Sequence, residues 1–374
     1  MTFDPALLRP LFPALTGPHA AAHFDAPGGT QTPTPVAEAI ATALVTPIAN
    51  RGSVTAAERA ADRIVTEART AMGELVNTDP CGIVFGRSMT QLTFSMATTL
   101  SRDWGPGDEV IVTRLDHDAN IRPWVIAAKH TGATVRWADF NPATGELAST
   151  AITDLLSDRT RLVAVTAASN LIGTMPDIPA ITAAARAVGA VSYVDAVHYA
   201  AHEVVDLPGL GADFLVCSPY KFCGPHLGVL AADPARLEQL RPDKIVPSPD
   251  TVPERFELGT LPYELLAGTT ATVDFLAGML DIAPDTLTGQ DARVEGSRRR
   301  RLVRALTALT RHEHRLRVRI EQGLTELGAK IYSRATRRTP TLLFTLPGIN
   351  SQEVYAGLAT HGVNAPASHF YALE

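Results

Sequence analysis

Short runs rich in β-branched residues alternate with helical stretches along most of the chain, and this alternation constrains the fold more than any other feature. One of the helical stretches is Ile178–Val188. The pattern predicts an α/β fold, a mostly parallel sheet with helices on both faces. In such sheets, ligands bind where the carboxyl ends of the strands open into loops. The predicted strands are Cys81–Phe85, Glu109–Thr113, Thr134–Trp137, Arg161–Thr166, Val191–Asp195 and Asp213–Cys217.

Two further helices and one loop are expected around this alternation. Ser53 can cap a helix over Val54–Met72, in which Thr55 and Glu58 resemble a capping box. The Pro-rich stretch 241–256 predicts a long surface loop. The arginine-rich stretch 297–326 predicts a helix whose arginines form a solvated face or, alternatively, a patch for a nucleic acid or an acidic partner. Its predicted buried stripe is Leu302, Leu306, Leu309, Leu316 and Ile320.

Composition limits the classes of function. The 374 residues are 45% hydrophobic, which excludes a disordered polymer and allows two domains. A net charge of -6 gives no case for nucleic-acid binding. No apolar run approaches a membrane span, and the start lacks the order of a signal peptide. Three scattered cysteines are too few for a disulfide framework or a zinc cluster. We therefore expect a soluble, cytoplasmic protein without a metal, a membrane partner or a nucleic-acid partner.

Lysine is rare, so amine chemistry has few places to occur. It is found only at Lys129, Lys221, Lys244 and Lys330. Lys221 follows a predicted buried strand within the run Cys217–Pro225. A lysine desolvated at a strand end has a lowered pKa and a free amine, as a Schiff base with an aldehyde cofactor requires. The alternative is a surface lysine on a turn.

Two further strand ends would support such a cofactor. Asp195 ends a predicted strand, where its carboxylate can keep the pyridine nitrogen of pyridoxal phosphate (PLP) protonated, or can simply cap a loop. The run Phe85–Gln91 passes from a strand through Gly86 into a helix start. Its amides and hydroxyls, at Ser88, Met89 and Thr90, suit a phosphate, although an ordinary helix cap has the same residues.

Three polar side chains complete the set. His117 follows the strand Glu109–Thr113 and could stack on a flat cofactor ring, or pair with its aspartate neighbours. Asn170 could donate to a phenolate oxygen, and His198 could reach the same oxygen; each has an ordinary turn or helix-start alternative. All these residues follow successive predicted strands, so one cleft would collect them.

The ordered motifs resemble the class V aminotransferases of PLP fold type I, and most closely their cysteine desulfurase-like branch. The resemblance covers nearly the whole chain. It implies a seven-stranded, mostly parallel sheet with helices on both faces and a smaller α+β C-terminal domain. The large domain would span residues 24–268, and the smaller one residues 1–23 and 269–374. The family also implies a homodimer with shared active sites.

Residue by residue, the resemblance implies specific roles. Lys221 resembles the Schiff-base lysine, Asp195 the pyridine-nitrogen partner and His117 the ring-stacking histidine. Asn170 resembles the contact to the cofactor's O3′ oxygen, and His198 stands where desulfurases carry glutamine. The remaining implied cofactor contacts are Thr90, Ser218 and Tyr220 at the phosphate and Thr260 at the partner subunit's phosphate.

The C-terminal stretch departs from the desulfurase pattern. The loop that carries the persulfide cysteine in desulfurases has Tyr371 in its place, and Pro366 replaces an expected arginine. His369 and Tyr371 are predicted to line the substrate mouth, with plain packing as the alternative. Family chains also carry a carboxylate-binding arginine beyond the position of Glu374, so either the sequence is truncated or another arginine acts. Candidates near the motif loops are Arg51, Arg87, Arg122 and Arg255.

These observations predict a PLP-dependent enzyme that acts on an amino acid or amine through an external aldimine. We expect elimination of the C–S lyase type without a persulfide cysteine. Transamination and epimerisation are the alternatives from the same family. A non-catalytic protein of the same fold is the competing class; it would lack a cofactor absorption band.

Overall fold

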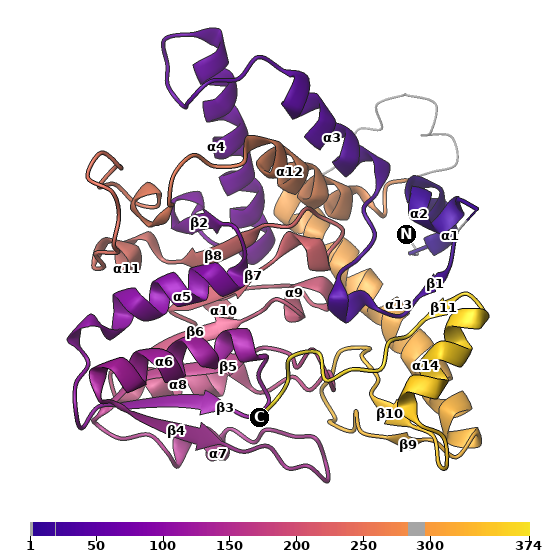
Figure 1. The fold of residues 1–374 in the computed structure, drawn as a ribbon. Helices are drawn as coiled ribbons and strands as arrows, with labels where there is room; N and C mark the ends of the chain where they lie inside the picture. The colour runs from indigo at the N-terminus through magenta and orange to yellow at the C-terminus, as the bar shows by residue number, and fades with distance from the viewer. Residues whose placement is uncertain (1–2, 19, 283–295) are drawn as a thin grey trace.

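A seven-stranded sheet forms the centre of the computed structural model, which describes residues 3–18, 20–282 and 296–374 (Figure 1). The strand order is β2-β8-β7-β6-β5-β3-β4. Only β8 runs antiparallel to its neighbours; the other pairs are parallel. The predicted α/β fold with a mostly parallel sheet is therefore confirmed. The strands are β2 (Ile83–Gly86), β3 (Glu109–Thr113), β4 (Thr134–Ala138), β5 (Thr160–Thr166), β6 (Val191–Asp195), β7 (Phe214–Cys217) and β8 (Gly228–Ala232).

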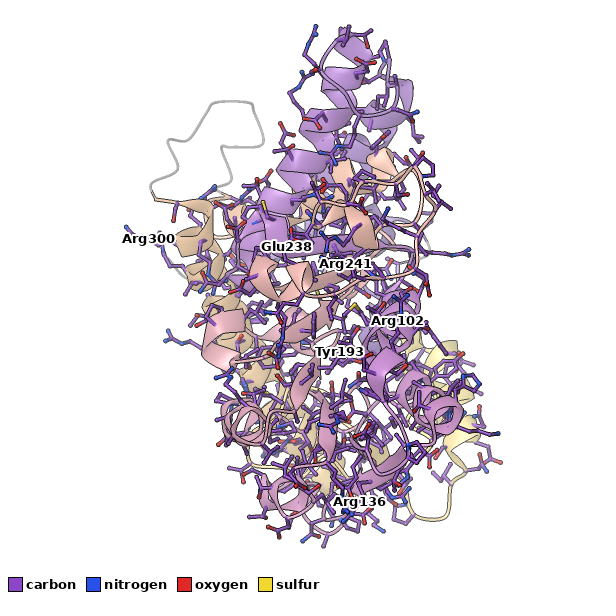
Figure 2. All side chains as sticks on the ribbon, turned by 90° about the vertical axis from the view of Figure 1, so that its left-hand side faces the viewer. Arg102, Arg136, Tyr193, Glu238, Arg241 and Arg300 are labelled. Carbon is purple, nitrogen blue, oxygen red and sulfur yellow. The ribbon has the colours of Figure 1, made fainter. Side chains whose placement is uncertain are left out.

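Helices cover both faces of the sheet because its strands are apolar on both sides. Along β2, Ile83 and Phe85 pack into one core and Val84 into the other. The first core contains α4, α8, α12 and α13, and the second contains α5 and α6, which lie in front of the sheet in Figure 1. Tyr193 belongs to the second core and lies in the middle of the molecule (Figure 2). The helices are α3 (Thr34–Val45), α4 (Ala56–Val76), α5 (Met89–Leu100), α6 (Arg122–Thr131), α7 (Thr150–Thr153), α8 (Ile178–Ala187), α9 (Tyr199–His202), α10 (Leu207–Leu210), α11 (Pro234–Glu238), α12 (Tyr263–Gly278) and α13 (Arg298–Glu326).

Helix α4 begins two residues later than the Ser53 cap predicts. Thr55 is the N-cap, and its hydroxyl accepts from the Glu58 amide while the Glu58 carboxylate accepts from the Thr55 amide. The capping box is thus confirmed, and the Ser53 cap is wrong. Val54 lies outside the helix and is 81% exposed, because the reciprocal cap starts the helix after it.

A smaller α+β part lies beside the sheet, formed by both ends of the chain (Figure 1). Strand β1 pairs with β11 in parallel, and β9 pairs with β10 in antiparallel. Helix α12 spans residue 268, the predicted domain boundary. The elements of this part are α1 (Pro5–Leu8), α2 (Pro13–Thr16), β1 (Ala22–His23), β9 (Lys330–Ile331), β10 (Phe344–Thr345), α14 (Ser351–Thr360) and β11 (Val363–Asn364).

Helix α13 follows its predicted span, with Ser297 as the N-cap. Leu302 and Leu306 are buried, whereas Leu316 and Ile320 are 46% and 36% exposed, so the predicted stripe is wrong in its second half. The first half packs on α4 and α12, and the second half extends past them. Arg300 projects outward from this helix (Figure 2). Within the described ranges, no helix combines the length and apolarity needed to cross a membrane.

Candidate active site

Lys221 lies just beyond the end of β7, in a short turn over Pro219–Lys221. The residue is 8% exposed, and its amine donates to the carbonyl of Pro27. Burial lowers its pKa to about 8, although the Asp195 carboxylate opposes the shift. Roughly a tenth of the amine is then unprotonated at pH 7, far more than for an ordinary lysine. The fold therefore provides a buried nucleophilic amine at this strand end.

Asp195 ends β6, directly beside β7 in the sheet. It is 5% exposed and accepts a 2.8 Å hydrogen bond from the Val197 amide. Burial raises its pKa to about 6, and the Lys221 ammonium opposes this. The same ammonium lowers the pKa of His117 and of His198. Asp195, His117 and His198 therefore each lie within electrostatic reach of Lys221.

The predicted phosphate turn joins β2 to α5. The hydroxyl of Ser88 caps the helix by accepting from the Gln91 amide at 3.1 Å. Met89 is buried and Thr90 is exposed. A 12-residue helix whose first amides open at a strand end attracts an anion, and a capping hydroxyl can still donate its own proton. The structure thus places Ser88, Met89 and Thr90 at a helix start suited to a phosphate.

Tyr220 and Ser218 flank this region from the lysine turn. Ser218 is 1% exposed. The Tyr220 ring stacks on His226, with centroids 4.8 Å apart and planes 11° apart. Gly29 approaches the same ring so closely, with φ 141°, that a β-carbon there would lie 3.1 Å from it. Burial raises the pKa of Tyr220, so its phenol is protonated at neutral pH.

His117 lies in the loop between β3 and α6. Its Nδ1 accepts from the Ala119 amide at 3.0 Å. Burial, with help from the Lys221 charge, lowers its pKa to about 4, so the imidazole is neutral at pH 7. Its ring lies 5.4 Å from the ring of Tyr371. The structure therefore brings together a predicted cofactor residue and a predicted residue of the substrate mouth.

Asn170 follows β5 and contacts the same C-terminal segment. Its Nδ2 donates to the carbonyl of Phe370 at 2.9 Å. Its Oδ1 is buried and has no hydrogen-bond partner among the described residues. Buried polar atoms are usually paired, so an orphaned acceptor at this strand end is consistent with a ligand site.

His198 is placed differently from the expected contact with a cofactor oxygen. Its Nε2 lies 2.8 Å from the Thr341 hydroxyl and 3.0 Å from that of Thr339. Its ring meets that of His202 edge-on at 4.7 Å. Burial holds its pKa well below the ordinary value. The Thr339 and Thr341 contacts come from a segment 140 residues away in sequence, and no local pattern points to them.

Thr260 and His369 are exposed. Thr260 lies on a turn after Glu254–Phe256, and Tyr371 is 64% exposed despite its contact with His117.

Asp116 was assigned no role from the sequence, yet it is 1% exposed and accepts from Asn120 at 2.7 Å and from Thr113. Burial raises its pKa to about 8. Its position in the loop that follows β3, beside His117, was the sequence signal that could have marked it as a site residue.

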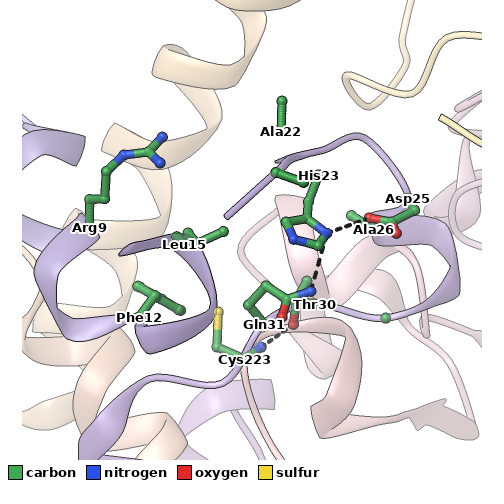
Figure 3. Close-up of a pocket in the computed structure, with 12 residues that line it drawn as sticks. Arg9, Phe12, Leu15, Ala22, His23, Asp25, Ala26, Thr30, Gln31 and Cys223 are labelled. Carbon is green, nitrogen blue, oxygen red and sulfur yellow. Dashed lines mark hydrogen bonds and ion pairs between the residues drawn. The ribbon is translucent and has the colours of Figure 1, made fainter. Parts of the chain in front are cut away.

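Three of the four candidate arginines are engaged in ion pairs. Arg51 pairs with Asp62 and Glu254, Arg122 with Asp118 and Glu374, and Arg255 with Glu238. Arg87 is exposed. A fifth arginine, Arg9, lines a cavity of about 270 Å³ that Cys223, two residues past Lys221, also borders (Figure 3). The other polar side chains that line the cavity are His23, Asp25, Thr30, Gln31 and Cys223.

Comparison with known proteins identifies the family. The family described as Aminotransferase class-V matches residues 22–286. This chain belongs to the class V aminotransferase family. A Mycobacterium tuberculosis relative named "Uncharacterized protein MT3887" is 32% identical over 370 residues, which cover 98% of this chain and 89% of that protein. A cysteine desulfurase of Yersinia pestis is 33% identical over 162 residues, or 43% of this chain and 40% of that enzyme.

The fold of this class V chain also matches solved structures. The apo structure of a cysteine desulfurase from Thermococcus onnurineus NA1 superposes with a TM-score of 0.86 at 24% identity. The match covers 100% of this chain and 89% of that one. The seven-stranded fold type I architecture expected from the resemblance is therefore confirmed. Class V members are generally PLP-dependent enzymes, which makes the site around Lys221 the place to test for that cofactor.

Proposed function

We propose that this class V chain is a PLP-dependent enzyme acting on an amino acid or amine, with elimination chemistry of the C–S lyase type. The observation that carries the proposal is the buried amine of Lys221, with its pKa near 8, beside the Asp195 carboxylate. A lysine with a purely structural role needs neither a lowered pKa nor a carboxylate at the end of the neighbouring strand. Perturbed groups that converge at strand ends mark functional sites.

The residues present fit this cofactor. Lys221 would bind its aldehyde carbon, and Asp195, on the neighbouring strand, would face its pyridine nitrogen. The amides of Met89 and Thr90 and the hydroxyls of Ser88 and Ser218 would hold the phosphate. The neutral ring of His117 would lie on the pyridine, and Tyr220 would complete the contacts, whereas His198 is engaged by Thr339 and Thr341. The Nδ2 of Asn170 gives one hydrogen to the Phe370 carbonyl and has a second for the phenolate oxygen, while its buried Oδ1, unpaired among the described residues, would accept from a donor of the ligand.

The cofactor, when bound, withdraws electrons from the substrate's Cα and so makes its proton acidic. The amine of Lys221, once free, would remove or relay that proton, since its pKa lies close to neutral pH. The carboxylate of Asp195 would keep the pyridine nitrogen protonated. His117 and Asn170 would orient the ring and its phenolate oxygen.

Elimination is favoured over persulfide transfer because no cysteine suits the latter. Cys217 is buried with a pKa raised to about 12, and that of Cys223 is raised to about 11. Cys81 precedes β2, and the residue is exposed. Partial desolvation of its thiol and the nearby Asp79 carboxylate nevertheless raise its pKa. The phenol of Tyr371, which by the resemblance would stand where desulfurases carry their cysteine, cannot accept sulfur as a thiolate does. The three cysteines are unpaired, which supports a reducing, cytoplasmic compartment.

The test is to incubate purified protein with PLP and then with cysteine, cysteine conjugates and pairs of amino donor and keto acid. Elimination removes the Cα proton and breaks the Cβ–S bond, so that the sulfur leaves as a thiol or sulfide; the released enamine tautomerises, and water hydrolyses the imine to a keto acid and ammonia, with no sulfur acceptor needed. Conversion to the pyridoxamine form would instead favour transamination, and loss of optical activity would favour epimerisation. Lys221→Ala should abolish the cofactor's visible absorption band. A wild type without that band would overturn the enzyme proposal.

We further propose that the enzyme is a homodimer with shared active sites. Thr260 is exposed on its own protomer, as a residue that serves the partner's phosphate would be. Its neighbour Leu258 is 63% exposed. An exposed apolar side chain beside a predicted shared residue supports an interface there. The solution mass of the holoenzyme tests this proposal.

A further inference from the structure

The segment 368–372, called the strap below, is tied across the ends of two neighbouring strands. Asn170, which follows β5, donates from Nδ2 to the carbonyl of Phe370 at 2.9 Å. The amide of Asp118, which follows β3, donates to the carbonyl of Tyr371 at 2.9 Å. Strands β3 and β5 are adjacent in the sheet. Two hydrogen bonds from separate loops therefore hold the strap against the candidate site.

The strap backbone adopts a conformation that aromatic residues seldom take. Phe370 and Tyr371 have φ of 45° and 58°, both in the left-handed region. Local hydrogen bonds stabilise the turn: the Ser368 hydroxyl accepts from the Phe370 amide, and His369 Nδ1 accepts from the Tyr371 amide at 3.0 Å. In this conformation, the Tyr371 ring contacts the His117 ring.

Among the described residues, one hydrogen bond is made by the His117 ring. Its Nδ1 accepts from the Ala119 amide, a bond that fixes one edge of the ring. The Tyr371 ring lies 5.4 Å away at 39°, and the His369 ring meets Tyr371 edge-on at 6.0 Å. The strap thus adds a second constraint on the imidazole, from a segment about 250 residues distant in sequence.

We infer that Tyr371 is a positioning residue, whose ring holds the His117 imidazole in the orientation needed to lie on the cofactor ring. This inference rests on the function proposed above. It assigns a role to the aromatic ring and none to the phenol hydroxyl. The hydrogen bonds from Asn170 and from the Asp118 amide fix the backbone of the strap, and so the position from which the Tyr371 ring contacts His117.

The test compares Tyr371→Ala, Tyr371→Phe and His117→Ala with a control, Tyr355→Ala, on the exposed side of α14. The measurements are the dissociation constant of PLP and the absorption maximum of the bound cofactor. An aromatic pair of this kind predicts about three- to tenfold weaker binding in Tyr371→Ala. The maximum should shift in the same direction as in His117→Ala. Tyr371→Phe should retain wild-type values, as should Tyr355→Ala.

A double variant and a cofactor-free measurement complete the design. Tyr371→Ala should add little to His117→Ala, because both remove the same interaction. In cofactor-free protein, the His117 side-chain resonance, assigned from the His117→Ala spectrum, should move in Tyr371→Ala and stay in Tyr371→Phe. Wild-type cofactor properties in Tyr371→Ala would overturn the inference, as would equal losses in Tyr371→Phe and Tyr371→Ala. If the wild type bound no PLP, the proposed function would fail, while the resonance would still report on the ring contact.

Discussion

Gly228 on β8 lies so close to Ser88 that a β-carbon at residue 228 would come within 2.2 Å of the Ser88 carbonyl carbon. The antiparallel strand therefore packs directly on the turn predicted to hold the phosphate. We expect Gly228→Ala to push the two backbones apart, because the atoms nearest to the new methyl group are backbone atoms of Ser88 and Met89 and not the end of a flexible side chain. Thermal or denaturant unfolding should show destabilisation of about 1–3 kcal/mol, with a weaker affinity for PLP.

Gly323→Ala is the matched control. Gly323 lies in helix α13 with nothing within 4 Å of its virtual β-carbon. Alanine there should stabilise the protein by about 0.5–1 kcal/mol, since it favours the helix over glycine. Equal effects of the two substitutions would contradict the close approach of β8 to Ser88.

The sheet was largely predictable because its parallel strands are continuous apolar runs. Glu109–Thr113 and Val191–Asp195 were predicted with their observed bounds. Strand β8, Gly228–Ala232, was not recognised from the pattern, because glycine and alanine dominate it and neither favours a strand. It forms because β2 and β7 pair with its two edges and the helical layers bury both its faces, which is a tertiary effect.

The candidate site was predictable where its residues follow strand ends. Lys221 and Asp195 are brought to adjacent strands by the parallel topology alone. The contacts of His198 with Thr339 and Thr341, and of Asn170 with Phe370, join segments far apart in sequence. No local spacing encodes such pairs, so only the folded chain reveals them.

The pKa of Lys221 sets the pH dependence of cofactor incorporation. The neutral amine attacks the cofactor aldehyde, so the rate should rise about tenfold per pH unit below the pKa and level off above it. With the pKa lowered to about 8, we expect the plateau above about pH 8, whereas an ordinary lysine would still gain rate beyond pH 10. Stopped-flow absorbance of apoprotein mixed with PLP measures this midpoint.

Asp195→Asn supplies the control for that profile. The Asp195 carboxylate raises the pKa of Lys221, so its neutralisation should move the midpoint downward by roughly one unit. An upward movement would show that the carboxylate does not act on this amine.

Glu257 forms a buried ion pair with Arg69 that supports β2. Its oxygens accept from both terminal nitrogens of Arg69, at 2.9 and 2.8 Å, and one also accepts from the Phe85 amide. Glu257→Ala would leave Arg69 buried without this partner, at a cost of about 3–5 kcal/mol of unfolding free energy. Asp139→Ala removes the partner of Arg114 at an exposed pair and should cost less than about 1 kcal/mol. Equal losses in chemical denaturation would contradict the structural role of Glu257.

A mixed dimer distinguishes shared active sites from separate ones. Lys221→Ala removes the amine from one protomer, and Thr260→Asp places a negative charge where the partner's phosphate is expected. If each site combines Lys221 of one protomer with Thr260 of the other, a mixed dimer of the two variants has one intact site. Random reassociation of equal amounts should then restore about a quarter of the wild-type cofactor absorbance, since half the dimers are mixed and each has one of two sites. Absorbance equal to that of the unmixed variants would show that Thr260 serves its own protomer, because no mixed dimer would then contain a complete site.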